Sequence, residues 1–228
     1  MAGTWRKGRR VMPVPDAKTI DSKSPPVRRR DADATKEKIL DAALQSFSTQ
    51  GFEASSTRQI ESLAGVKRGL ISYHFGSKQQ LWEAAVDRLM RVVGKDLQDA
   101  LDGMANVDDF ARFRFFVRAY VRVCARHPEL NRLMIREGVQ ATGRLKWLAQ
   151  RSVRPWFDRV AKLLDDARAL GCAPQMDHHN FFYILTGSAA TIFANAAEAR
   201  LLTGRDTLSD AEVSAHADVV ANLLFPEK

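Results

Sequence analysis

The chain has 228 residues, 45% of them hydrophobic, and carries 35 basic against 27 acidic side chains, for a formal net charge of +8. This length and apolar content exclude a chain that is disordered throughout, because they suffice to build a core. The most apolar stretch, residues 181–197, is interrupted by polar residues and is shorter than the roughly 20 apolar residues that a bilayer requires, so we expect no membrane contact.

The N-terminal residues contain no apolar run followed by a small-residue cleavage site, so we expect no secretory signal. Two cysteines, Cys124 and Cys172, are too few for a disulfide framework. We therefore expect reduced thiols and a cytoplasmic location.

Most of the net positive charge lies at the N-terminus. The first 30 residues carry nine basic side chains against two acidic ones, together with four prolines and no apolar periodicity. This composition predicts a disordered basic arm over residues 1–32. Either the arm adds sequence-independent attraction to DNA phosphates, or it is an extension without a role in binding.

From Asp31 onward the apolar residues follow a helical period, which predicts an all-α fold of about nine helices. The first helix should run from about Asp33 or Thr35 to Gln50, with Gly51 as a left-handed stop. Thr57 is the expected N-cap of a second, short helix. A tight turn at 64–66 then leads into a third helix over 67–74.

The later helices are predicted from caps and breakers. Ser77 opens a capping box with Gln80, and Ser209 opens a second one with Glu212. Gly171 and Pro174 should end the long helix over about 143–170. The expected ranges are about 77–102, 106–127, 129–138, 143–170, 177–203 and 209–224.

The three helices between Asp33 and Phe75 have the layout of a helix-turn-helix at about residues 56–75, whose last helix would enter the DNA major groove. Its apolar positions Val66, Leu70, Ile71 and Phe75 should face inward. The outward face is then cationic and uncrowded, and we expect it to contact DNA. The predicted DNA-binding residues are Thr57, Arg58, Lys67, Arg68, Gly69, Ser72, Tyr73, His74 and Lys78.

Different roles follow from the chemistry of these side chains. Arg68 can donate two hydrogen bonds to guanine, and Lys67 is the second candidate for base reading. Gly69 would let the helix backbone approach the bases closely. Donors at Thr57, Tyr73, His74 and Lys78 suit phosphate oxygens, which set the pose without reading sequence.

The run Thr57-Arg58-Gln59-Ile60, followed by residues 64–81 (AGVKRGLISYHFGSKQQL), resembles the signature of TetR-type transcriptional regulators. The similarity is dense over about residues 33–93 and beyond that rests only on the number of helices. Ser72 stands where that family usually has an aromatic residue, with Tyr73 next to it. The resemblance implies a DNA-binding domain over 33–93 and an all-helical effector-binding and dimerisation domain over 94–228.

The resemblance further implies a homodimer that pairs through the last two helices, binds a palindromic operator and acts as a repressor released by a small organic ligand. Large apolar side chains of the second domain are the candidates for lining a ligand pocket. Arg136, Glu137, His178 and His179 are candidates for orienting the ligand. The candidate lining residues are Phe113, Phe116, Tyr120, Met134, Trp147, Trp156, Phe181 and Tyr183.

Two other functions stay open at this point. A dimeric DNA-binding regulator without a small-molecule effector, controlled by abundance or by a protein partner, would have the same helix-turn-helix. An all-α enzyme is the other alternative, but the sequence has no phosphate-binding glycine loop, no Gly-x-Ser-x-Gly and no His-Glu-x-x-His. We therefore expect no catalytic residues, no metal site and no cofactor.

Overall fold

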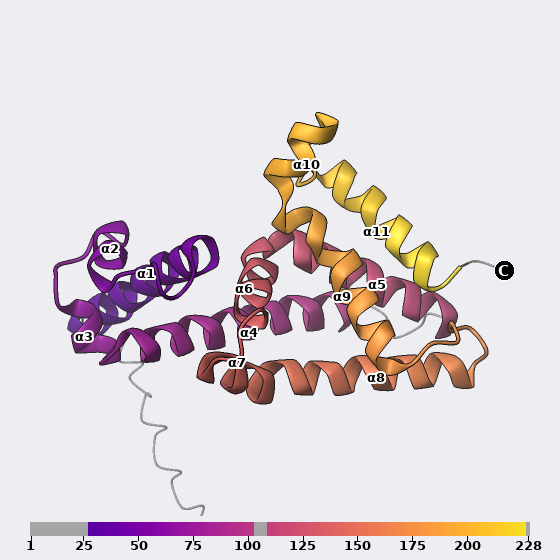
Figure 1. Ribbon diagram of the computed structural model, residues 1–228, viewed down its shortest axis with the longest axis horizontal. Helices are drawn as coiled ribbons and strands as arrows, with labels where there is room; N and C mark the ends of the chain where they lie inside the picture. Colours follow the sequence, from indigo (N-terminus) through magenta and orange to yellow (C-terminus); the bar gives the residue numbers. More distant parts are fainter. Residues whose placement is uncertain (1–26, 103–108, 227–228) are drawn as a thin grey trace, which may run out of the picture.

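The computed structural model describes residues 27–102 and 109–226, and within these residues the chain is helical and contains no strand. The expected all-α fold is confirmed. In Figure 1 a small group of helices, α1 to α3, is joined to a larger group by the long helix α4. The helices are α1 (Val27–Gln50), α2 (Thr57–Leu63), α3 (Leu70–Phe75), α4 (Lys78–Asp102), α5 (Asp109–Arg126), α6 (Pro128–Gly138), α7 (Gly143–Leu148), α8 (Arg154–Ala169), α9 (His178–Ala194), α10 (Ala196–Thr203) and α11 (Asp210–Leu224).

Two hydrophobic cores hold these helices together. The N-terminal core is the cluster around Ile39, Phe47, Ile60, Ile71 and Trp82, and the C-terminal core is the cluster formed mainly by α5, α8, α9 and α11. Helix α4 takes part in both, because Leu81 and Trp82 near its start lie in the N-terminal core while Leu97 lies in the C-terminal core. One continuous helix therefore connects the two cores.

The N-terminal core is completed by residues that are distant in sequence. Leu133 of α6 and Leu148 of α7 are buried in it, and Trp147 packs edge-on against Trp82 with ring centroids 5.5 Å apart. These residues belong to the predicted second domain, 94–228. The domain division at residue 93 stays a prediction, but the packing of the first domain depends on α6 and α7.

The C-terminal core is closed by α11, which packs chiefly against α5. The buried guanidinium of Arg114 donates to the carbonyl oxygen of Phe225 and to the side-chain oxygen of Asn222, both at 2.6 Å. Phe225 also stacks on Phe113 at 5.6 Å. These contacts hold the C-terminal end of α11 on α5.

Several predicted helix boundaries need correction. Helix α1 begins at Val27, earlier than Asp33, so the last part of the predicted arm is helical, and the rest of the arm lies outside the described residues. The expected cap at Asn106 also lies outside them. Asp177 and Ser209 do cap α9 and α11, because their side chains accept the backbone N–H groups of Asn180 and Glu212.

The two longest predicted helices are interrupted. Between α7 and α8 the chain forms one π-helical turn, Ala149–Val153, which ends two residues before Pro155. Proline has no N–H to donate and its ring crowds the preceding turn, which accounts for the widened backbone. The expected helix over 177–203 is divided at Asn195, which ends α9 and begins α10. No helix of the described part is long and apolar enough to cross a membrane.

His127 joins α4 to the start of α6. Its ring nitrogens lie 3.0 Å from the carboxylate of Asp96 and 3.4 Å from that of Glu129, and the side chain is mostly buried. The hydrogen bond to Glu129, assisted by that to Asp96, raises the pKa of His127 above 6.5 although burial opposes the shift. Two acceptors facing both ring nitrogens favour the doubly protonated imidazolium.

We predict that His127→Gln destabilises the protein in a pH-dependent way. Because the pKa is higher in the folded state, the stabilisation is complete below the unfolded-state pKa and is lost as the pH rises through the folded-state value. The difference in unfolding free energy between wild type and variant should therefore be larger at about pH 5.5 than at about pH 8.5. Urea unfolding across this range measures it, with His179→Gln on an exposed histidine as the control. A pH-independent difference would contradict the assignment.

Candidate nucleic-acid interface

The first element of the interface is α2, which begins with a capping box. The Ser56 hydroxyl accepts the N–H of Gln59 at 3.2 Å, and the Gln59 side chain accepts the N–H of Ser56 at 3.1 Å. Ser56 is therefore the N-cap, and the predicted cap at Thr57 is wrong by one residue. The two side chains thus accept the backbone N–H groups of both Ser56 and Gln59, whereas a single threonine cap would accept only one.

The turn after α2 contains two glycines in left-handed conformation, Gly65 with φ +64° and Gly69 with φ +88°. Gly69 is the N-cap of α3, so α3 starts at Leu70. The predicted helix over 67–74 is therefore too long at its start, because a residue at positive φ cannot continue a right-handed helix. Lys67 and Arg68 lie in the turn, and Gly69 supplies the positive φ with which the turn ends. The close approach to the bases at Gly69 stays a prediction.

The inward and outward faces agree with the predicted pattern. Ile71 is buried in the N-terminal core, and Val66, Leu70 and Phe75 pack against it. The opposite side is exposed and includes Tyr73, which is 80% accessible. The other exposed residues of the predicted face are Lys67, Arg68, Gly69 and Ser72.

The remaining predicted DNA contacts differ in accessibility. Arg58 is exposed on the first turn of α2, whereas Thr57 and His74 are half-buried. The ring of His74 lies against that of Tyr73, with centroids 4.8 Å apart in edge-on geometry. These side chains share the surface of the α2–α3 unit.

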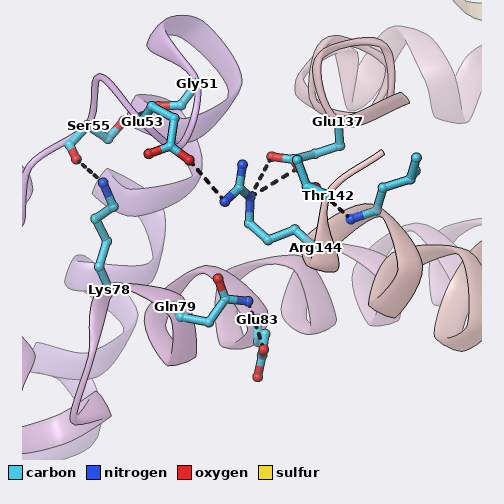
Figure 2. A network of polar contacts seen from close by, with 10 residues as sticks. Gly51, Glu53, Ser55, Lys78, Gln79, Glu83, Glu137, Thr142 and Arg144 are labelled. Carbon is cyan, nitrogen blue, oxygen red and sulfur yellow. Dashed lines mark hydrogen bonds and ion pairs between the residues drawn. The ribbon is translucent and has the colours of Figure 1, made fainter. Parts of the chain in front are cut away.

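Lys78, at the start of α4, is held inside the domain. Its ammonium donates to the carbonyl oxygen of Ser55 at 2.9 Å (Figure 2). The same ammonium lies 4.3 Å from the centroid of the Phe52 ring. The Ser77 hydroxyl accepts the N–H of Gln80, so the first half of the predicted capping box is present. The Gln80 side chain accepts from the same hydroxyl, not from the Ser77 N–H as the box requires.

The loop before α2 is also held from the C-terminal half of the chain. The guanidinium of Arg144 bonds to Glu53 at 3.2 Å and to buried Glu137 at 3.1 Å (Figure 2). It also lies 3.9 Å from the centroid of the Phe52 ring. Phe52 thus contacts one cation from α4 and one from α7. Sequence reasoning missed Phe52, Glu53 and Arg144, because no local pattern pairs residues so far apart.

A second link reaches the end of α1. Arg136 of α6 donates to the backbone carbonyl oxygens of Ser48 and Thr49, which belong to the last turn of α1. A cation at a helix C-terminus is favourable because the last carbonyls lack intrahelical donors. Arg136 and Glu137 therefore make contacts between α6, α7 and the DNA-binding helices, and their candidate role in orienting a ligand stays a prediction.

The candidate ligand-lining residues do not come together at one place. Met134 and Trp147 pack against the N-terminal core, and Tyr183 is 62% exposed. His178 bonds to Asp165 at the surface, and His179 is exposed beside Tyr183. The sequence pattern marked these side chains as apolar or amphipathic without showing which core each joins. The five that share the C-terminal core are Phe113, Phe116, Tyr120, Trp156 and Phe181.

Comparison with known proteins gives a consistent result. The profile described as "Bacterial regulatory proteins, tetR family" matches residues 39–85. RutR, an HTH-type transcriptional regulator of Escherichia coli strain K12, is 25% identical over 183 residues, covering 80% of this chain and 84% of RutR. The HTH-type transcriptional repressor NicS of Pseudomonas putida is 38% identical over 63 residues, covering 28% of this chain and 30% of NicS.

Among solved structures, AibR in complex with isovaleryl coenzyme A and operator DNA has a TM-score of 0.68 at 16% identity, covering 85% of this chain and all of AibR. This similarity supports the fold. The related sequences are transcriptional regulators, which confirms the expectation that the chain is not an enzyme. Residues 39–85 therefore match the tetR family of bacterial regulatory proteins, and the chain as a whole is similar to DNA-binding transcriptional regulators of that family.

Proposed function

We propose that the protein is a homodimeric repressor that binds a palindromic operator through the turn and helix formed by residues 66–75. The observation that carries this proposal is that Lys67 and Arg68 are exposed just before the N-cap of α3, whereas Ile71 within α3 is buried. A cationic turn on a packed helix pair can approach a major groove without rearrangement. Repression, rather than activation, is supported by relatives such as NicS.

Within this proposal, Arg68 and Lys67 read bases and the surrounding donors contact phosphates. Both cations precede the left-handed Gly69, so they project from the turn at the N-terminal end of α3, where helix-turn-helix proteins contact base edges. Lys78 has three ammonium protons, of which one is used by Ser55. We propose that its main contribution is to hold the loop before α2, with phosphate contact through the other two.

We predict that Arg68→Ala relaxes preference at one base position by about 1 to 3 kcal/mol, because a bidentate arginine discriminates guanine by that amount. Arg58→Ala is the matched control, because we propose that this exposed cation contacts a phosphate. It should weaken binding to all sequences and lower the slope of log affinity against log salt concentration by about one. Binding isotherms on a selected sequence, its single-base variants and random duplex at several salt concentrations measure both effects. Equal loss on specific and random DNA for Arg68→Ala would refute base reading.

Support for a dimer comes from the outer surface of the last helices. Large apolar side chains are exposed on α9, α10 and α11, an arrangement that marks an interaction surface more often than a free one. Two copies placed about one duplex turn apart would read both halves of a palindrome. The exposed residues are Tyr183, Ile184, Leu201, Leu202, Val219 and Leu223.

We predict that Val219→Asp yields a monomer, because it places a charge in the proposed α11 interface. Val139→Asp is the matched control, since Val139 is exposed as well, at 77% against 62% for Val219, but follows α6. Sedimentation of both variants and selection of bound sequences from a random DNA pool are the measurements. Wild type and Val139→Asp should be dimeric and enrich a palindrome. A dimeric Val219→Asp variant, or enrichment of single half-sites by wild type, would contradict the proposed dimer.

Ligand control is the finer part of the proposal. A small organic molecule bound among the helices of the C-terminal core would favour a dimer conformation in which the two copies of α3 and its preceding turn are spaced differently. It would shift the equilibrium only as far as its affinities for the DNA-binding and the non-binding conformations differ. AibR is a neighbour solved with a coenzyme A ester. The aromatic group of Phe116, Tyr120 and Trp156, with centroids 5.1 to 6.4 Å apart, is the part of this core that we propose a ligand would open.

The alternative is a dimeric DNA-binding regulator without a small-molecule effector. The observation in its favour is that Phe113, Phe116, Tyr120 and Phe181 are packed as ordinary core, each at most 7% exposed. A screen for compounds that release the selected operator separates the two functions. Release by a compound that also raises thermal stability supports ligand control, whereas release by no compound supports the alternative.

A further inference from the structure

A buried carboxylate lies directly beneath the cationic turn. Glu61, the fifth residue of α2, is 6% exposed, and its Oε1 accepts the backbone N–H of Gly69 at 2.9 Å and that of Ile71 at 3.1 Å. Gly69 is the N-cap of α3 but has no side chain with which to cap it. The cap is therefore supplied from α2, across the turn.

Glu61 fixes the turn at both of its ends. Its own carbonyl oxygen accepts the N–H of Val66 at 3.0 Å, where the turn begins, and its side chain takes the two N–H groups where α3 begins. Lys67 and Arg68 lie between these fixed points. One residue of α2 thus determines where the turn starts, where it ends and how α3 is oriented.

Electrostatics favour the same arrangement. The first N–H groups of a helix lack intrahelical acceptors and carry partial positive charge, so a carboxylate is the most favourable partner. The pairing also satisfies a carboxylate that is almost fully buried, and buried charges persist in proteins when hydrogen bonds compensate them. Small movements of this oxygen would shift the turn that carries the two cations.

We propose that Glu61 is a positioning residue for operator recognition, which holds the Lys67–Arg68 turn and the start of α3 in the geometry that reads bases. The proposal rests on the base-reading function proposed above for that turn. Glu61 itself does not contact DNA in this account. For this positioning role, the distance from its carboxylate oxygen to the N–H groups of Gly69 and Ile71 is decisive. The negative charge is secondary for this role.

The test compares two conservative variants. Glu61→Asp keeps the charge but shortens the side chain by one methylene, so its oxygen cannot reach both N–H groups. Glu61→Gln keeps the reach and an acceptor oxygen but removes the charge. We expect Glu61→Asp to lower the ratio of affinities for selected and random duplex about tenfold, the equivalent of one charge-assisted hydrogen bond, and Glu61→Gln to retain most of it.

Ile60→Val on the neighbouring residue is the control for stability, because it weakens the N-terminal core without touching the cap. A purely structural role would lower the affinities for both kinds of DNA together, as Ile60→Val should, and leave their ratio unchanged. An unchanged ratio in Glu61→Asp, or equal loss in Glu61→Asp and Glu61→Gln, would overturn the proposal. Absence of sequence preference in the wild-type protein would instead refute the base-reading function.

Discussion

The structure depends on one shared packing constraint: the DNA-binding helices cannot complete their hydrophobic core without side chains from the C-terminal half of the chain. Leu133 and Leu148 are almost fully buried among residues of α1 to α4, and Trp147 covers the ring of Trp82. Close-packed interiors transmit displacements because they do not deform smoothly. A displacement of α6 or α7 is therefore transmitted to the helix-turn-helix by direct packing contacts as well as by α4.

Polar contacts follow the same route. Arg136 ties α6 to the last turn of α1, and Arg144 ties α7 to the loop before α2 through Phe52 and Glu53. Glu61 then connects α2 to the end of the Lys67–Arg68 turn, because its carboxylate accepts the N–H groups of Gly69 and Ile71. These contacts form a physical connection between the C-terminal helices and the Lys67–Arg68 turn, which is what effector control of operator binding requires.

Much of the fold could be predicted from the sequence, because it is encoded locally. The inward face of Val66, Ile71 and Phe75 follows from helical spacing, and the Ser209 cap from its box. Gly69 was misjudged because a glycine inside a periodic pattern is equally consistent with a helix or a left-handed cap. The packing of Trp147 and the partners of Lys78 and Arg144 could not be predicted, because they are contacts between residues far apart in sequence.

The measurement that tests the shared core most directly is amide hydrogen exchange of α1 to α3 in Leu148→Ala and Leu164→Ala, which truncate completely buried leucines of the N-terminal and C-terminal cores, respectively. Leu148→Ala should lower protection of α1 to α3 by about 2 to 5 kcal/mol, the usual cost of such a cavity. Leu164→Ala should affect these helices less. Protection of α1 to α3 that is unchanged in Leu148→Ala would contradict the account.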